Sequence, residues 1–272
     1  MTDTNDTTGF KYSILASGST GNSTYIETPK HHILVDAGLS GKKLTDLLSE
    51  IDRDMSDIDT LLITHEHSDH IKGLGVLARK YHMDIYANQG TWNELTESLV
   101  GKIDDSQKHI FEEGKTLSFD DIDIESFGVS HDAAEPQFYR FMKDNKSFVI
   151  LTDTGYVSDR MTGIIKNADA YLMESNHDVE LLRMGPYPWN TKQRILSDKG
   201  HLSNDAGAEA AFDVIGSKTK HIFLGHRSQH NNLKELAHLT METTLEQHDI
   251  DTHHVVHIHD TSHTTASPLY QI

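Results

Sequence analysis

A short stretch of metal-binding side chains directly after an apolar run limits the possible folds of this chain more than any other sequence feature. The stretch THEHSDH, residues 64–70, follows the apolar residues 61–63 and holds three histidines and two acidic residues. An apolar run of this kind is typical of a buried strand, and a solvated polar loop hardly explains three histidines at its end. The pattern indicates a rigid site at the end of a strand, with four candidate metal ligands: His65, His67, Asp69 and His70.

The spacing of these side chains and the absence of cysteine define the kind of metal site. His65 and His67 lie two positions apart, so in an extended chain both imidazoles point the same way and can bind one ion. Asp69 and His70 follow after the chain has turned, so they can point toward a second ion. The chain contains no cysteine, which excludes thiolate ligands and disulfides. Imidazole and carboxylate ligands without thiolate suit Zn²⁺, Mn²⁺ or Fe.

Three further residues occupy similar positions elsewhere in the chain. Each is a lone histidine or aspartate just after an apolar β run: His131 in VSHDA, Asp153 in LTDTG and His226 in LGHRS. We expect them near residues 64–70, because a rigid site is built where several strands end side by side. Taken singly, each could equally be a hydrogen-bonded loop residue. Together with the opening stretch, the set favours a metal site.

Strand and helix patterns alternate in two blocks along the chain. Apolar β runs predict strands at 12–16, 23–28, 32–38, 59–65, 168–175 and 220–226 and several more between 109 and 151. Helical patterns predict helices at 40–51, about 72–82, near 158–167, 203–216 and 232–248. This pattern predicts an α/β fold, a four-layer αββα sandwich of two mixed sheets packed face to face with helices outside. We expect one domain over residues 10–272 after a disordered N-terminal tail, residues 1–9.

Charge is distributed unevenly along the chain. The formal net charge of −18 argues against a nucleic-acid partner, because phosphate binding draws on lysine and arginine. Residues 183–227 are an exception, since seven basic and four acidic residues give this segment +3 and leave −21 for the remainder. Arg194 and Lys199 within it are therefore candidate contacts for a DNA substrate.

The sequence shows no sign of membrane insertion or secretion. There is no apolar run of about 18 residues, and the N-terminal MTDTNDTTG lacks a charged-then-apolar signal pattern. We therefore expect a cytoplasmic protein without membrane contact, and no feature identifies a protein partner.

Ordered motifs over nearly the whole chain resemble those of the metallo-β-lactamase superfamily. THEHSDH matches its HxHxDH signature, and the motifs that accompany it are VDAG (35–38), SHDA (130–133), TDTG (152–155) and LGH (224–226). The stretches 16–28, 200–211 and 224–232 are similar to the YycJ/WalJ subgroup, bacterial enzymes regarded as DNA exonucleases. The resemblance implies the αββα sandwich with two divalent metal ions, Zn²⁺ or Mn²⁺, in its central cleft.

The resemblance also implies a role for each motif residue. One ion would be held by His65, His67 and His131, the other by Asp69, His70 and His226, with Asp153 bridging both. Asp36 in VDAG would orient a ligand histidine or the adjacent loop rather than bind metal. A hydroxide bridging the two ions would be the nucleophile that attacks a phosphodiester. Asp69 thus belongs to both the ligand set and the catalytic set.

The segment GHLSNDAGAEAA, residues 200–211, is similar to a segment of the tRNA 3′-processing ribonuclease in which a histidine helps to protonate the leaving group. By this resemblance His201, positioned by Glu174, contacts the scissile phosphate or protonates the departing oxygen. The alternative is that His201 only precedes a helix N-cap at Ser203. Ser203 and Asn204 are candidate substrate contacts, because a helix N-terminus exposes amides that suit phosphate oxygens.

Three classes of function remain open from the sequence. The first is a dinuclear-metal phosphodiesterase that acts on DNA as an exonuclease. The second is a small-molecule metallo-hydrolase for a lactone, thioester or cyclic phosphodiester, and the third is a non-catalytic scaffold with a structural metal. Trp189 in the basic segment could stack on a base, although a tryptophan is more often part of a core or an interface. Within the histidine-rich residues 252–263, the stretch VVHIHD (255–260) is interpreted as an ordinary edge strand.

Overall fold

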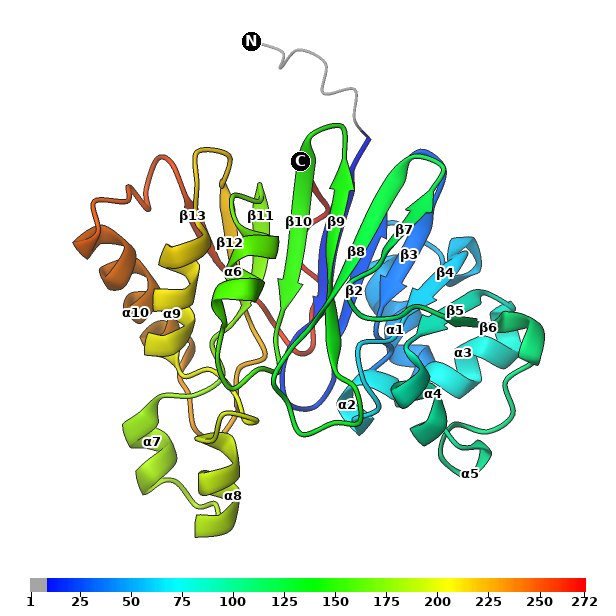
Figure 1. Ribbon diagram of the computed structural model, residues 1–272, viewed down its shortest axis with the longest axis horizontal. Helices are drawn as coiled ribbons and strands as arrows, with labels where there is room; N and C mark the ends of the chain where they lie inside the picture. Colours follow the sequence, from blue (N-terminus) through cyan, green and yellow to red (C-terminus); the bar gives the residue numbers. More distant parts are fainter. Residues whose placement is uncertain (1–8) are drawn as a thin grey trace.

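Two seven-stranded sheets form the centre of the protein in a computed structural model that describes residues 9–272 (Figure 1). The predicted tail, apart from Gly9, lies outside the described residues. The first sheet contains, in order, β14 (Tyr270–Gln271), β1 (Lys11–Ala16), β2 (Ser23–Glu27), β3 (His32–Val35), β4 (Thr60–Leu62), β5 (Asp84–Ala87) and β6 (Lys108–Ile110). The second contains β13 (His257–Asp260), β12 (His221–Gly225), β11 (Ala170–Glu174), β10 (Lys146–Leu151), β9 (Gln137–Lys143), β8 (Ile122–Gly128) and β7 (Thr116–Phe119).

Helices lie on the outer faces of both sheets (Figure 1). Five helices alternate along the chain with strands β3 to β6 of the first sheet: α1 (Gly41–Ser49), α2 (Ser68–Ile71), α3 (Leu74–Tyr81), α4 (Gln89–Glu94) and α5 (Glu97–Val100). Short 3₁₀ turns lie at Met55–Asp57 and Asp105–Gln107. The second sheet carries α6 (Asp159–Ile165), α7 (Val179–Met184), α8 (Trp189–Ile195), α9 (Asn204–Val214) and α10 (Lys234–Gln247). The predicted four-layer αββα sandwich is confirmed.

Both sheets are mixed, and their parallel halves fix where functional loops can lie. In the first sheet β3, β4, β5 and β6 are parallel, and in the second β10, β11, β12 and β13 are parallel. Parallel neighbours end at the same edge of a sheet, where open α/β sheets place their ligand sites. The loops after β4, β10 and β12 therefore meet at one end of the sandwich.

The core lies between the sheets, with a second apolar layer beneath the helices of the first sheet. Tyr12 of β1 stacks on Phe148 of β10 with ring centroids 4.3 Å apart, which joins the two sheets. The layer beneath α1 and α3 includes Leu44, Leu47 and Leu77, all fully buried or nearly so. Burial of these side chains supplies most of the driving force for the sandwich.

Most predicted elements are present, but strands β5 and β14 and the short helices α2, α4, α5, α7 and α8 are missing from the prediction. Ser203 caps α9 by accepting from the Ala206 N–H, as expected, and Ser40 caps α1 in the same way by accepting from the Lys43 N–H. The predicted edge strand at the C-terminal histidines is β13, at the edge of its sheet. The helices α7 and α8 were missed because helices of six and seven residues show too little periodicity. No helix in the described part of the chain is long and apolar enough to span a bilayer.

Candidate metal centre

The candidate ligands come from both sheets and meet at one end of the sandwich. Residues 64–70 follow β4 and lead into α2, while the three other candidates follow strands of the second sheet: His131 after β8, Asp153 after β10 and His226 after β12. Side-chain nitrogens and oxygens of these residues fall into overlapping groups whose atoms lie within 4.8 Å of one another. The structure thus brings together all seven residues predicted as ligands.

Three histidines form the first group. One ring nitrogen each of His65, His67 and His131 lies within 4.8 Å of the other two. Nε2 of His131 is 3.2 Å from Nδ1 of His67. Three imidazoles that converge in this way are a common donor set for a divalent metal such as Zn²⁺.

Asp69, His70 and His226 form the second group, again with atoms within 4.8 Å of one another. Oδ2 of Asp69 lies 3.4 Å from Nε2 of His226 and 3.6 Å from Nε2 of His70. One carboxylate and two imidazoles give a donor set of mixed nitrogen and oxygen character, which suits Zn²⁺ and Mn²⁺.

Asp153 lies between the two groups. Its Oδ2 is 3.4 Å from Nε2 of His70, in the second group, and its Oδ1 is 3.8 Å from Nε2 of His131, in the first. One carboxylate therefore contacts a histidine from each group with a different oxygen. This is the position that a carboxylate shared by two ions requires.

Asp36 lies behind the second group and orients it. Its Oδ2 accepts hydrogen bonds from Nδ1 of His70 at 2.8 Å and from Oγ1 of Thr64 at 2.9 Å, and its Oδ1 accepts from the Thr64 N–H at 2.9 Å. Nε2 of His70 is then the nitrogen that faces the centre. A carboxylate behind a ligand histidine fixes the ring and its tautomer.

Backbone and hydroxyl oxygens fix two histidines of the first group in the same way. Nδ1 of His65 lies 3.0 Å from Oγ1 of Thr64, and Nδ1 of His131 lies 3.1 Å from the carbonyl oxygen of Gly200. In both rings Nε2 is left for the centre.

Glu174, at the end of β11, holds two histidines with one oxygen. Its Oε1 accepts from Nδ1 of His201 at 2.8 Å and from Nδ1 of His226 at 2.9 Å. Its Oε2 accepts from the backbone N–H of Thr154 at 3.0 Å and of Leu202 at 3.2 Å. The fully buried carboxylate therefore orients a candidate ligand and the candidate proton donor together.

Two buried atoms at the centre fit a bound cation. Nε2 of His65 and Oδ2 of Asp153 have no hydrogen-bond partner among the described residues, and both side chains are almost completely buried. Leaving such a group unpaired costs about 1–3 kcal/mol. Because each atom offers a lone pair and the two belong to one group of nearby donors, a divalent cation would satisfy both.

Three residues of the centre adopt a left-handed backbone. The φ angles are 62° at Asp36, 50° at Asp153 and 52° at His226. Residues other than glycine rarely adopt this conformation, and it costs of order 1–3 kcal/mol at each position. Each of the three lies at or within two residues of a strand end, where the sharp turn directs its side chain into the centre.

Burial and neighbouring charges shift the pKa values of residues in the centre in different directions. Burial, reinforced by the nearby His70, lowers the pKa of His65 well below its ordinary value, which keeps that ring in the neutral form that binds metal. Burial also lowers the pKa of His70, but Asp36 and Asp153 outweigh it and raise the pKa to about 9. Burial alone would raise the pKa of Asp69, yet His70 and His226 lower it below its ordinary value, so this carboxylate is ionised.

The two predicted substrate contacts at the start of α9 lie in different settings. Oγ of Ser203 accepts from the N–H of Ala206 at 3.1 Å and caps the helix. Asn204 is buried, where its Oδ1 accepts from Ser175 at 2.8 Å and its Nδ2 donates to Asn232 at 3.0 Å. The structure therefore commits the Asn204 side chain to internal bonds and does not place it toward a substrate.

The two predicted basic contacts also differ. The guanidinium of Arg194 pairs with the carboxylate of Asp132 through Nε and Nη2, the second contact at 2.9 Å. Asp132 directly follows His131 and has Oδ1 3.6 Å from its Nε2, so this ion pair lies beside the first group. Lys199 is exposed in the turn after α8.

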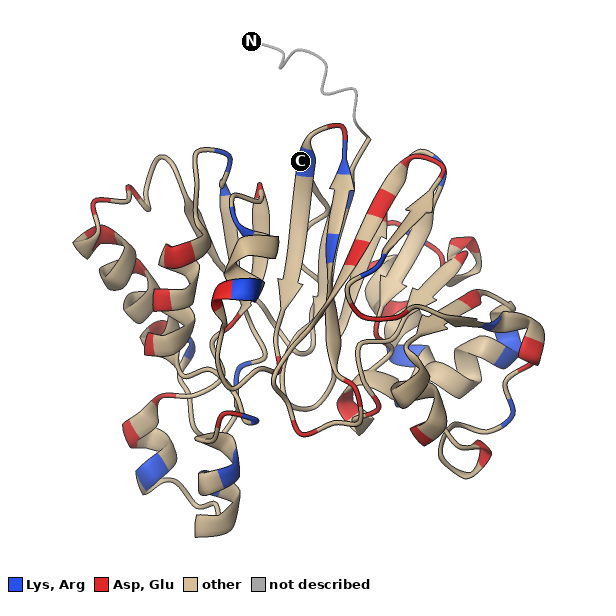
Figure 2. Ribbon diagram, viewed as in Figure 1, with Lys and Arg blue, Asp and Glu red and all other residues tan. Residues whose placement is uncertain are grey.

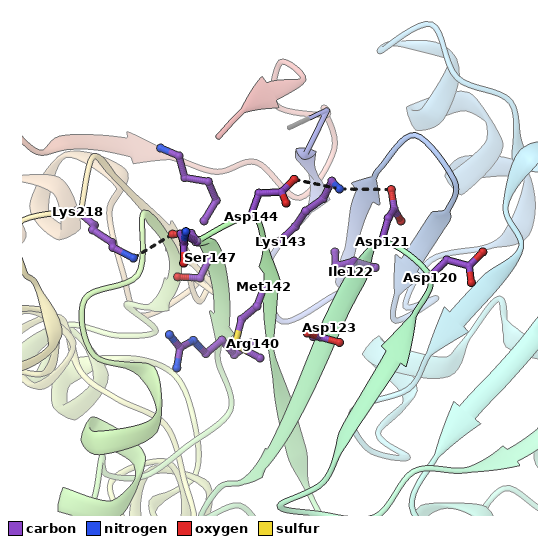
Figure 3. A pocket seen from close by; sticks show the side chains of 12 residues that line it. Asp120, Asp121, Ile122, Asp123, Arg140, Met142, Lys143, Asp144, Ser147 and Lys218 are labelled. Carbon is purple, nitrogen blue, oxygen red and sulfur yellow. Dashed lines mark hydrogen bonds and ion pairs between the residues drawn. The ribbon is translucent and has the colours of Figure 1, made fainter. Parts of the chain in front are cut away.

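Residues 183–227 do not form one basic face, contrary to what their linear charge suggests (Figure 2). Lys192 is buried and its Nζ donates to the carbonyl oxygens of Arg183 and Gly185, at 2.7 Å each. Lys218 donates to the Asn145 carbonyl at 2.9 Å and lines a cavity of about 610 Å³ with several residues of the β9–β10 turn (Figure 3). That cavity adjoins the start of β10, whereas Asp153 follows its end.

Two residues at the centre were not predicted. Nδ2 of Asn22 lies 3.1 Å from Nε2 of His70 and 3.3 Å from Oδ2 of Asp69, and the side chain is buried. Asn22 ends the Gly/Ser-rich loop between β1 and β2, and its place in that loop is the one available signal. Asp132 stands directly after a predicted ligand, but its partner Arg194 lies 62 residues away, so no local pattern reveals the pair.

Comparisons with known proteins identify the family of the chain. A family model described as the beta-lactamase superfamily domain matches residues 31–259. The chain belongs to the metallo-β-lactamase superfamily. Within it, the chain is 66% identical over 265 residues to exodeoxyribonuclease WalJ of Streptococcus pneumoniae, covering 97% of this chain and 98% of the relative. It is 54% identical over 253 residues to exodeoxyribonuclease YycJ of Bacillus anthracis, covering 93% and 96%.

A solved structure shows the superfamily fold independently of close sequence similarity. The metallo-β-lactamase fold protein YhfI from Bacillus subtilis superimposes with a TM-score of 0.69 at 14% identity, covering 95% of this chain and 99% of the other. The superfamily fold and the clusters of histidine and aspartate together imply that the chain binds divalent metal.

Proposed function

We propose that this chain is a metal-dependent phosphodiesterase that degrades DNA as an exonuclease, with two divalent ions, Zn²⁺ or Mn²⁺, in the candidate metal centre. The observation that carries the proposal is the pair of ligand groups joined by Asp153, with the His201–Glu174 pair beside them. The relatives from Streptococcus pneumoniae and Bacillus anthracis, both named exodeoxyribonucleases, support DNA as the substrate. A DNA substrate also favours a cytoplasmic location.

The proposed ligand sets follow the two groups. We assign His65, His67 and His131 to one ion, Asp69, His70 and His226 to the other, and Asp153 to both. When bound, such ions contact phosphate oxygens as Lewis acids and lower the pKa of a water molecule. Asp36 and Thr64 hold the ligand rings in place.

We assign proton transfer to His201. Its Nδ1 donates to Glu174, so its Nε2 is the nitrogen left for a substrate. The ring centroid lies 5.1 Å from that of His131 and 5.0 Å from that of His226, which puts the ring over the boundary between the two groups. In its protonated form His201 would deliver the Nε2 proton to the departing oxygen of the cleaved phosphodiester, and the hydrogen bond to Glu174 orients the ring for this transfer.

The test is elemental analysis of the purified protein followed by an assay on end-labelled single- and double-stranded DNA with Zn²⁺ and with Mn²⁺. We expect bound divalent metal and stepwise shortening from a DNA end. Asp69→Ala should abolish the activity, while Glu94→Gln, at an exposed position on α4, is the matched control. Metal-replete protein that leaves both forms of DNA intact would contradict the proposal.

A second assay, on small substrates, distinguishes this function from the small-molecule alternative. A panel of lactones and thioesters beside bis-p-nitrophenyl phosphate reports whether carboxyl or phosphoryl compounds are cleaved. Faster turnover of a lactone or thioester than of DNA would favour a small-molecule hydrolase, which the names of the relatives do not support.

A further inference from the structure

Residues 179–199 form a projection that we call the arm, made of α7, α8 and the turn after α8. Figure 1 shows α7 and α8 standing away from the two sheets. Three large apolar side chains of the arm are exposed: Met184 by 76%, Trp189 by 63% and Leu196 by 39%. Isolated exposed apolar side chains are normal, but a tryptophan and a methionine on one small projection indicate a contact surface.

Hydrogen bonds within the arm join α8 to the end of α7, so the two helices keep a defined arrangement. Nζ of the buried Lys192 in α8 donates to the carbonyl oxygens of Arg183 and Gly185 at the end of α7, at 2.7 Å each. Those carbonyls would otherwise be unsatisfied at the helix C-terminus. Asp178 caps the other end of α7 by accepting from the Leu181 N–H at 2.7 Å.

The base of the arm contacts the candidate metal centre. Arg194 near the end of α8 pairs with Asp132, which follows His131. The carbonyl oxygen of Gly200, just after the arm, lies 3.1 Å from Nδ1 of His131. The arm therefore adjoins the candidate metal centre at this end.

The charge of the arm suits a polyanion even though the whole chain is acidic. Its basic residues are Arg183, Lys192, Arg194 and Lys199 and its acidic residues are Glu180 and Asp198, which gives 4 − 2 = +2 against −18 for the chain. Lys192 and Arg194 are already engaged within the protein, and Arg183 pairs with Glu180. Lys199 is thus the exposed cation best placed to meet a phosphate near the centre.

We propose that the arm binds single-stranded DNA continuous with the strand in the metal centre, with Trp189 stacking on a base and Lys199 contacting a phosphate. The proposal rests on the proposed function and adds the form of the substrate. An exposed indole needs the free face of a base, which an unpaired strand offers and the interior of a duplex does not. The net negative charge elsewhere confines this contact to the arm.

The length of α8 predicts how long a substrate must be to reach Trp189. Trp189 and Arg194 lie five residues apart, or about 7–8 Å along a helix that rises 1.5 Å per residue. Stacked bases follow each other at about 3.4 Å along a strand. For a stacked strand that follows α8 away from the centre, the base on Trp189 would lie about two nucleotides beyond the phosphate nearest Arg194, so we expect a dinucleotide to be too short to use the indole.

The experiment compares metal-loaded full-length wild type, Trp189→Ala, Trp189→Phe and the matched exposed control Leu239→Ala on a single strand of about ten nucleotides and on a dinucleotide. Base–aromatic stacking predicts that Trp189→Ala lowers kcat/KM on the longer strand roughly fivefold to a hundredfold, mainly through KM. The loss on the dinucleotide should be far smaller. Trp189→Phe should recover most of the activity, and Leu239→Ala, at a site 56% exposed on α10, should behave as wild type.

A binding measurement tests the same contact without turnover. The chain has two tryptophans, so Trp92→Phe leaves Trp189 as the only indole. A metal-loaded protein of this type should show quenched indole fluorescence with a phosphorothioate-linked single strand, which resists hydrolysis. Absence of quenching at strand concentrations that inhibit cleavage would overturn the proposal.

The outcomes separate the arm from the proposed function. If the wild type degrades DNA and Trp189→Ala degrades it equally well, only the arm proposal is overturned. The same holds if Trp189→Ala loses activity equally on the longer strand and on the dinucleotide. Wild type that cleaves no DNA with Zn²⁺ or Mn²⁺ overturns the proposed function and the arm with it. A change in oligomeric state in Trp189→Ala, without a change in DNA turnover, would assign the surface to a second copy of the chain and overturn the proposal.

Discussion

Replacing Glu174 with glutamine separates the charge of this carboxylate from its shape. The two oxygens of Glu174 accept four hydrogen bonds, two from the histidines His201 and His226 and two from backbone N–H groups. A glutamine has one oxygen and one NH₂ group in the same place. Backbone N–H groups cannot become acceptors, so the glutamine oxygen must face them and its NH₂ must face the two rings.

This orientation forces a change of tautomer in both histidines. Nδ1 of each ring must then accept from the glutamine NH₂, which moves the ring proton to Nε2. In His226 the Nε2 lone pair that faces Asp69 is lost, and with it the proposed metal contact. Because all four hydrogen-bonding sites can still be paired, we expect Glu174→Gln to fold, with a stability loss within about 1–3 kcal/mol.

The effect on metal binding should be much larger than the effect on folding. Changes behind a metal ligand typically cost 10–100-fold in affinity or activity, and we expect a loss in the upper part of that range because one change disturbs both His226 and His201. The assay is metal content after dialysis against graded chelator, together with thermal unfolding and DNA turnover, with Glu94→Gln as the control. Unchanged metal affinity and turnover in a folded Glu174→Gln protein would refute the reasoning.

Three further predictions concern charge, pH and metal removal. Lys199→Glu should lower the ratio of DNA turnover to bis-p-nitrophenyl phosphate turnover several-fold, as measured by parallel rates; equal losses on both substrates would reject a role in polymer binding. Burial would raise the pKa of Glu27, but hydrogen bonds from Arg53 and Lys11 lower it to about 2, so its contribution to stability is present above about pH 4.5 and is lost as the pH falls toward 2. Unfolding by denaturant should therefore show a deficit for Glu27→Gln at pH 7 that shrinks below pH 4.5, and a deficit independent of pH would contradict this. Chelation should lower Tm, because bound metal stabilises only the folded protein; a Tm that does not respond to chelator in metal-replete protein would count against the site.

The candidate ligands could be predicted because each obeys a local rule. His131, Asp153 and His226 directly follow apolar β runs, and strand ends of parallel sheets converge by topology alone. The two sheets and most of the longer helices were visible for the same reason, since periodicity reports burial. The role of Glu174 beside His201 followed from resemblance, and the 2.8 Å contact between His201 Nδ1 and Glu174 Oε1 agrees with that pairing.

What the sequence could not give depends on contacts between distant segments. Nothing local shows that Lys192 is buried against carbonyl oxygens or that Arg194 meets Asp132, so a linear charge count overestimated the basic surface. Asn204 looked like a substrate contact at a helix N-terminus, yet a buried amide network with Asn232 occupies its side chain. The short helices α7 and α8 were hidden by their length and by the prolines around them.

The division of the candidate ligands between the two sheets has a consequence for how the protein matures. Residues 64–70 belong to the first sheet, whereas His131, Asp153 and His226 belong to the second. During synthesis the early ligands leave the ribosome long before His226, so the ion assigned to Asp69, His70 and His226 cannot be fully enclosed until β12 has been made and docked. Metal binding would then be a late step of folding that joins the two sheets, and loss of metal would destabilise both sheets together.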